Sequence, residues 1–149
     1  MQRDTAGLRA VLPILEEHQV VQFDALTGCR GLTGQGQIWS DPVDANCGYS
    51  AVWLAPKGGP RPFTSEASAS YTRIAGAIAG SGAAIHRVEG IGFDLSGRLT
   101  NAEFVLSEDD WNRWSYFYEP GYTLPVQMRN GPDYTAIDSD WYFRHKSWA

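Results

Sequence analysis

The residues that could carry covalent chemistry in this chain begin with two cysteines and three histidines. Cys47, in "DANCGYS", lies at a loop-to-strand junction, where catalytic nucleophiles occur. His86 could serve as its general base, with Asp44 orienting the imidazole ring. An ordinary buried cysteine fits the same pattern, because cysteine is among the most buried residue types. A small hydrolase with a Cys47/His86 site is therefore the enzymatic alternative.

Metal, cofactor and phosphate sites find no support in the spacing of such residues. His18, His86 and His145 form no His-x-x-x-His pair, and the cysteines form no Cys-x-x-Cys motif. The Gly-rich piece "GCRGLTGQGQ" lacks the lysine of a phosphate-binding loop. The segment after it, "IWSDPVD", is a poor helix, whereas a dinucleotide site needs a helix there. We interpret the piece as a flexible loop between strands and expect no metal and no cofactor.

Carboxylates offer a second enzymatic alternative, a carbohydrate-active site. Glycoside hydrolysis needs two acids about 5 to 9.5 Å apart across a cleft. The pair Asp109/Asp110 is one candidate, and Glu103 and Glu119 lie nearby in the sequence. Exposed acids at strand ends are commonplace, so the pair does not specify a site by itself.

The stretch "SEDDWNRWSYFYEPGY", residues 107–122, combines six aromatic residues with four acids. Tyrosine and tryptophan anchor protein interfaces because one end of the ring system is apolar and the other forms hydrogen bonds. An acidic rim steers a basic partner towards such a surface. The predicted partner-binding residues are Asp109, Asp110, Trp111, Trp114, Tyr118 and Glu119.

The strand register within this stretch decides which rings are exposed. Alternation places Trp114, Tyr116 and Tyr118 on one side of a strand and Phe117 on the other. Only one side need be core, and the register with the three rings in the core is the alternative. We predict that Phe117 is buried and that the corner "EDDWNRW", residues 108–114, is exposed.

The length and charge of the chain limit the classes of function. A chain of 149 residues predicts one domain over residues 1–149. The net charge is −5, and no Lys/Arg cluster occurs beyond "RHK" near the C-terminus. We therefore expect no nucleic-acid partner, because such binding needs a clustered basic patch.

The sequence also indicates where the protein works. No apolar run approaches the roughly 20 residues of a membrane-spanning helix, so no membrane is expected. The N-terminal segment is typical of a helix and not of a signal peptide, which favours a cytoplasmic location. In a reducing compartment Cys29 and Cys47 are expected to be free thiols, with a disulfide as the alternative.

The elements that must position these residues follow from periodicity and breakers. A helix is expected over 4–18, with Pro13 as a kink or stop. A second helix should begin at Thr64 or Ser65 and end at "GSG", because Ala67, Tyr71, Ile74 and Ile78 recur at helical spacing. Strands are expected at 19–26, 49–56, 85–94, 99–106 and 114–120, with short elements at 37–39 and 140–146. This order predicts an α+β fold with a mainly antiparallel sheet and two main helices packed on it.

The C-terminal half resembles a known family at the level of pattern. "GIGFDLSGRLTNAEFVLSEDDWNRWSYFYEPGYTLP" contains a strand, a "D-x-x-G-R" turn, a second strand, and then tryptophans and "Y-x-Y-E". This succession, over about residues 49–122, resembles the immunity proteins of bacterial polymorphic-toxin systems, particularly the YezG-like group. The chain departs from the family in placing its tryptophans after the hairpin and in the long tail after Pro125.

The resemblance implies a non-enzymatic protein that binds and inhibits one cognate toxin domain, and the acidic residues favour a basic one. It implies charge complementarity from Asp109, Asp110 and Glu119, with Trp111, Trp114 and Tyr118 as anchors. For this chain we expect a monomer or a homodimer, and a subunit of a homo-oligomer whose aromatic cluster packs against itself is a further alternative. Our leading hypothesis from the sequence is an immunity protein.

Overall fold

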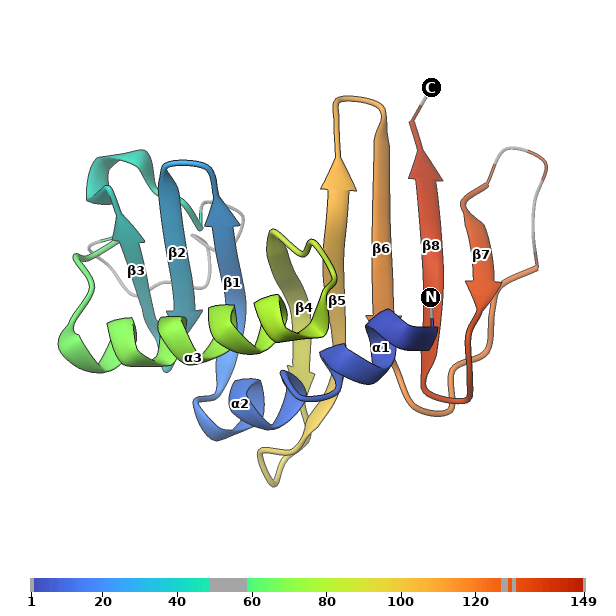
Figure 1. Cartoon of the computed structure of the whole chain (residues 1–149), viewed down its shortest axis with the longest axis horizontal. Coiled ribbons are helices and arrows are strands. Elements are labelled where there is room, and N and C mark those ends of the chain that lie inside the picture. Colours follow the sequence, from blue (N-terminus) through green and yellow to red (C-terminus); the bar gives the residue numbers. More distant parts are fainter. Residues whose placement is uncertain (1, 49–58, 127–128, 130, 149) are drawn as a thin grey trace.

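The computed structural model describes residues 2–48, 59–126, 129 and 131–148, and its main feature is one eight-stranded antiparallel sheet. The strand order is β3-β2-β1-β4-β5-β6-β8-β7 (Figure 1). The strands are β1 (Val20–Leu26), β2 (Cys29–Gly34), β3 (Gln37–Asp41), β4 (Arg87–Phe93), β5 (Leu99–Glu108), β6 (Asn112–Tyr118), β7 (Asp133–Ala136) and β8 (Trp141–Ser147). The predicted α+β class with an antiparallel sheet is confirmed.

Helices lie on one face of this sheet, and the core fills the space between (Figure 1). The helices are α1 (Gln2–Leu8), α2 (Leu12–Glu17) and α3 (Ser65–Ser81), with a short 3-10 turn, η1 (Val43–Ala45). Phe23, Phe104 and Trp141 are the largest side chains that are almost fully buried. The opposite face of the sheet is called the open face below.

The first predicted helix is present as two pieces. The chain leaves α1 after Leu8 and starts α2 at Leu12, with Pro13 in the first turn of α2. Proline is tolerated there because the first-turn N–H groups have no partner within the helix. Leu8, Val11 and Leu15 are fully buried and anchor the two pieces in the core.

Helix α3 forms as its sequence predicts. The Thr64 side chain caps it by accepting a hydrogen bond from the Ala67 N–H at 3.1 Å. Gly82 ends it in the left-handed conformation, with φ of 79°. The four residues expected on its inner face, Ala67, Tyr71, Ile74 and Ile78, are the buried ones.

The Gly-rich loop predicted after the first strand is wrong in part, because it contains strand β2. Gly31 pairs with Asp24 of β1 and with Ser40 of β3. A Cβ atom there would lie 3.1 Å from the Cys47 carbonyl carbon and from the Gly48 nitrogen, so close packing explains this glycine. Strand β7 was also missed, and the strand predicted over 49–56 lies outside the described residues.

The register of β6 corrects the prediction that Phe117 is buried. Tyr116 is 4% exposed and faces the helices, where its hydroxyl donates to Asp4 at 2.7 Å. Phe117 points to the open face, where it is half-buried and stacks on Tyr142 of β8 with ring centroids 4.9 Å apart. In the part of the chain that the structure describes, α1, α2 and α3 pack on the same face, so the alternating side chains of β6 separate into a core set and an open-face set.

Candidate functional site

The strongest candidate for a functional surface lies where β5 turns into β6 and where β8 ends. Figure 1 shows this end of the sheet projecting beyond the helices. We call it the tryptophan corner. Its residues are Asp109, Asp110, Trp111, Trp114, His145, Lys146 and Trp148.

Asp109 organises the turn at the tip of the corner. Its Oδ1 accepts hydrogen bonds from the backbone N–H groups of Trp111 and Asn112, both at 2.8 Å. The Trp111 N–H, as the strongest influence, lowers the pKa of the Asp109 carboxyl because these bonds favour the charged form. With Asp109 fixing the turn, Asp110 and Trp111 lie at its tip, where Trp111 is 60% exposed.

Trp114 is held by a ring stack across two strands. Its indole lies parallel to the imidazole of His145, with centroids 4.8 Å apart. The His145 Nε2 lies 2.8 Å from the Asn112 Oδ1. An amide oxygen only accepts, so Nε2 carries a proton and donates it. The stack and this hydrogen bond join β8 to the corner.

Trp148 adds a second exposed indole to the corner, and its backbone is hydrogen-bonded to that of Trp111. Its backbone N–H donates to the Trp111 carbonyl oxygen at 2.8 Å. Its side chain is 47% exposed, and Lys146 Nζ lies 5.3 Å from its ring centroid. Sequence reasoning missed Trp148 and His145, because only the pairing of β6 with β8 brings "RHKSWA" to this turn.

The predicted binding residues do not all come together. Asp109, Asp110, Trp111 and Trp114 share the corner, whereas Tyr118 and Glu119 lie at the other end of β6. At about 3.3 Å per residue, Glu119 is roughly 26 Å from Trp111. Tyr118 packs on buried Trp141, with centroids 5.3 Å apart, and so belongs beside the core.

The rim of the corner is acidic. Asp109 and Asp110 are exposed, and the Asp133 side chain is 76% exposed on neighbouring β7. Arg113, the nearest arginine in the sequence, is held by Glu108 at 2.9 Å and by Glu89. Its charge is therefore matched within the protein.

The open face carries a second group of charged residues, whose acids and arginines pair with one another. Asp24, only 1% exposed, accepts from Arg87 Nε at 2.9 Å, and Arg87 also pairs with Glu108. Burial raises the pKa of Asp24, while Gln22 and Arg87 oppose that rise. Further along, Ser115 and Arg144 contact Glu103 at 2.7 and 3.4 Å. Because these acids already have donors, the network has a structural role.

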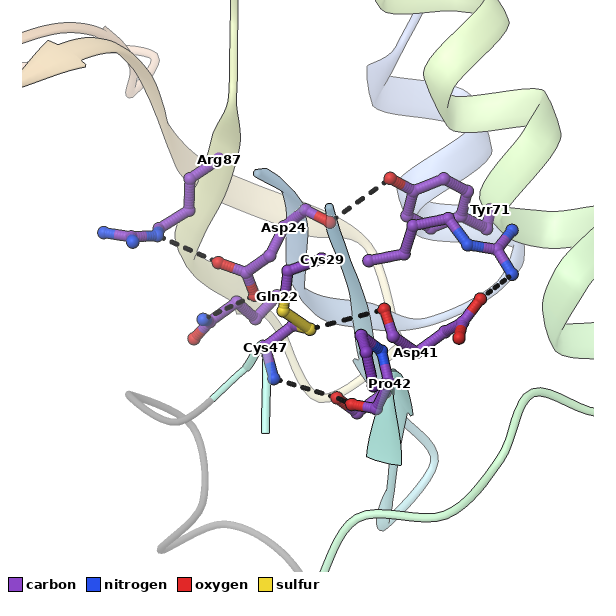
Figure 2. The surroundings of a disulfide bond; sticks show 10 residues. Gln22, Asp24, Cys29, Asp41, Pro42, Cys47, Tyr71 and Arg87 are labelled. Carbon is purple, nitrogen blue, oxygen red and sulfur yellow. Dashed lines mark hydrogen bonds and ion pairs between the residues drawn. A yellow bond between two sulfur atoms is a disulfide. The ribbon is translucent and has the colours of Figure 1, made fainter. Parts of the chain in front are cut away.

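The cysteines correct two expectations. Cys29 and Cys47 form a disulfide across β2 and the segment after β3, with Cα atoms 5.6 Å apart (Figure 2). The prediction of free thiols is therefore wrong. A cystine sulfur has no thiolate to act as a nucleophile, so the Cys47/His86 site is absent. The His86 ring nitrogens lie instead 3.3 Å from the Leu106 carbonyl oxygen and 3.5 Å from Glu108.

One hydroxyl–imidazole pair does exist, between Ser70 and His18, but its protons are in the wrong place for catalysis. His18 Nε2 lies 2.9 Å from Arg73 Nη1, which can only donate. The proton of the neutral ring is therefore on Nδ1, which donates to Ser70 Oγ at 3.0 Å. An imidazole that donates to the hydroxyl cannot remove its proton.

Comparisons with known proteins add no assignment to this geometry. No family model, no curated protein and no solved structure matches the chain. Among the described residues, no group of three or more His, Cys, Asp or Glu side chains could hold a metal ion. Over the same residues, no helix has both the length and the apolar character needed to cross a membrane.

Proposed function

We propose that this chain is a non-enzymatic binding protein and that its partner docks on the tryptophan corner. The observation that carries the proposal is the exposure of Trp111 at the tip of a turn that Asp109 fixes. Exposed Trp148 lies directly beside it. Exposed indoles on neighbouring backbone segments, with a polar rim, are typical of an interaction site, and tryptophan is enriched among residues that dominate binding energy.

The charge of the rim favours a basic partner. Asp109, Asp110 and Asp133 are exposed here, with Lys146 as a nearby cation. Complementary charge raises the association rate and suppresses wrong partners. The resemblance of the sequence to immunity proteins suggests the class: a basic toxin domain that this chain binds and inhibits. The protein then performs no chemistry of its own.

The cytoplasmic location stays a prediction. The Cys29–Cys47 disulfide argues against it, because disulfides persist in oxidising compartments and are rare in the cytosol. An inhibitor that works outside the cytoplasm fits both the disulfide and the proposed binding role. Thiol labelling of the protein in its native cells would distinguish the two locations.

A binding measurement with matched variants tests the proposal. The first candidate partner is the C-terminal domain encoded by the gene immediately upstream. We expect Trp111→Ala to weaken binding by about 2 kcal/mol or more, roughly a 30-fold increase in Kd. Leu95→Ala is the control, because Leu95 is fully exposed on the β4–β5 turn.

Two outcomes would contradict the proposal. One is a loss of less than about 1 kcal/mol at both Trp111 and Trp148, since the corner would then contain no dominant contact. The other is an upstream gene for a metabolic enzyme whose product does not bind this chain. Calorimetric titration measures the first, and co-purification detects the second.

A further inference from the structure

A groove separate from the tryptophan corner lies between α3 and the strands β2 and β3. Its volume is about 350 Å³. These strands lie at the β3 end of the sheet, far from β8 and the corner (Figure 1). Small-molecule sites in proteins occupy about 300 to 1,000 Å³, so the groove can hold a ligand of modest size.

Small residues on α3 open this groove. Ala67, Ala69 and Ser70 line the helix side, and Gly34 lines the strand side. A leucine at any of the three helix positions would extend into the space. The room is therefore a consequence of the sequence of α3, whose buried positions outside the groove, Tyr71, Ile74 and Ile78, carry larger side chains.

The inner part of the groove is apolar. Val20 and Leu32 line it with exposures of 1% and 2%, and half-buried Trp39 forms the wall opposite the helix. An aromatic or branched aliphatic group would be removed from water here, which is favourable by about 25 cal/mol per Å² of apolar surface.

The polar end of the groove contains an arginine with unused donors. Arg73 Nη1 contacts Glu17 Oε2 at 3.0 Å and His18 Nε2 at 2.9 Å. Within the described part of the chain, its Nη2 and Nε have no hydrogen-bond partner. A guanidinium has five N–H donors in a fixed fork and stays charged. Glu17 and His18 thus hold one edge of Arg73 in place and leave the other edge available.

Two other polar groups of the groove, His18 and Ser70, already have hydrogen-bond partners. His18 donates to Ser70, and Ser70 Oγ in turn donates to the Glu66 carbonyl oxygen at 3.2 Å. The Glu66 carboxylate lies at the opposite end, seven residues before Arg73 and about 10 Å away along the helix axis. The position best suited to an anion is therefore the free edge of Arg73.

From these contacts we infer that the groove binds a small monocarboxylate with an apolar or aromatic body. The carboxylate accepts two hydrogen bonds from Arg73, in the bidentate geometry that a guanidinium favours. The body lies between Trp39 and the small residues of α3. This site is independent of the tryptophan corner and of the partner proposed there.

The test uses 3-phenylpropionate and its neutral amide, 3-phenylpropionamide, which share one ring and chain. Eleven heavy atoms at about 0.3 kcal/mol each predict a Kd on the order of a few millimolar for the acid. We expect the acid to shift the indole N–H signal of Trp39 in a two-dimensional NMR titration. The amide should bind about tenfold more weakly, because it lacks the charge-assisted pair.

Two pairs of variants complete the test. Arg73→Gln should weaken binding of the acid about tenfold, and Arg98→Gln, on the β4–β5 turn, should leave it unchanged. Ala69→Leu should fill the groove and abolish binding, whereas Ala79→Leu, also exposed on α3 but outside the groove, should not. Equal binding of acid and amide, or full binding by Ala69→Leu, would overturn the inference. The NMR spectrum of each variant confirms that it is folded.

Discussion

Trp114 lies parallel to His145 across the β6–β8 pair, with ring planes 2° apart and centroids 4.8 Å apart. This stack connects the turn that presents Trp111 to strand β8, which Trp148 directly follows. The two exposed indoles are therefore connected through the β6–β8 pair, although they come from distant parts of the sequence. The geometry of the corner depends on that pairing.

The stack predicts a graded response to substitution at His145. His145→Ala removes both the ring contact and the hydrogen bond to Asn112, and should lower the free energy of unfolding by about 1 to 3 kcal/mol. His145→Phe keeps a ring but loses the hydrogen bond to Asn112 and the 4.0 Å contact of Nδ1 with Asp133, so it should cost about 1 kcal/mol. Urea denaturation measures both. Equal and negligible effects would show that the stack does not support the corner.

The disulfide predicts a dependence of stability on redox state. It joins two cysteines that are 18 positions apart in the sequence. In the chain-entropy model, a crosslink over a loop of this length stabilises the fold by about 3 kcal/mol. The double variant Cys29→Ser, Cys47→Ser should lose that amount in urea denaturation. A reductant should destabilise the native protein to a similar extent and leave the double variant unaffected. An unchanged native midpoint in reductant would contradict the prediction.

The open-face network predicts that Arg87 matters more than an exposed arginine. Arg87→Met leaves the almost fully buried Asp24 without its cation, and breaking such a pair costs about 3 to 5 kcal/mol. Arg9→Met breaks a surface pair between Arg9 and Asp140, whose side chains are 45% and 31% exposed respectively. This loss should cost about 0 to 1 kcal/mol. Similar losses in both variants would mean that the buried pair stabilises the fold no more than the surface pair does.

The Arg87→Met defect should also depend on pH. Burial raises the pKa of Asp24, so the Asp24 carboxyl group binds its proton more tightly in the folded state than in the unfolded state. Stability contributed by such a group is present at low pH and is lost as pH rises through its folded pKa. The loss in free energy of unfolding that Arg87→Met causes should therefore shrink as pH falls towards about 4, near the ordinary pKa of an aspartic acid side chain. A deficit that grows on acidification would contradict this sign.

Tyr142 predicts a change at the alkaline end. Burial, followed by the nearby Glu119 charge, raises its pKa to about 12. Its contribution to stability is present below the ordinary value of about 10 and is lost as pH rises from there towards 12. Tyr142→Phe should remove one late step from the ultraviolet titration of the tyrosines. The variant should also lose less stability than the native protein between pH 10 and 12. An ultraviolet titration that the substitution leaves unchanged would contradict the assignment of the late step to Tyr142.

Local signals in the sequence determined much of the fold. Helix α3 follows from the Thr64 cap, the spacing of its buried residues and Gly82, all within one segment. The β4–β5 hairpin follows from two β-rich runs around "LSGR", and the exposed tip at Trp111 from the acids and the turn beside it. These features depend on neighbours in the chain, which a sequence displays directly.

Only the tertiary structure decided the features that depend on distant segments. Cys29 meets Cys47 because part of the Gly-rich piece forms strand β2, which pairs with β3. The glycines of this piece concealed the strand in the sequence. Phe117 faces outward because the helices pack on one face of the sheet, and strand alternation alone does not say which face. The predicted binding residues separate because β6 is extended, and Trp148 joins the corner because β8 pairs beside it. Pairing between strands that are far apart in the sequence leaves no local sequence pattern. Which residues meet at the tryptophan corner was therefore decided by the tertiary structure.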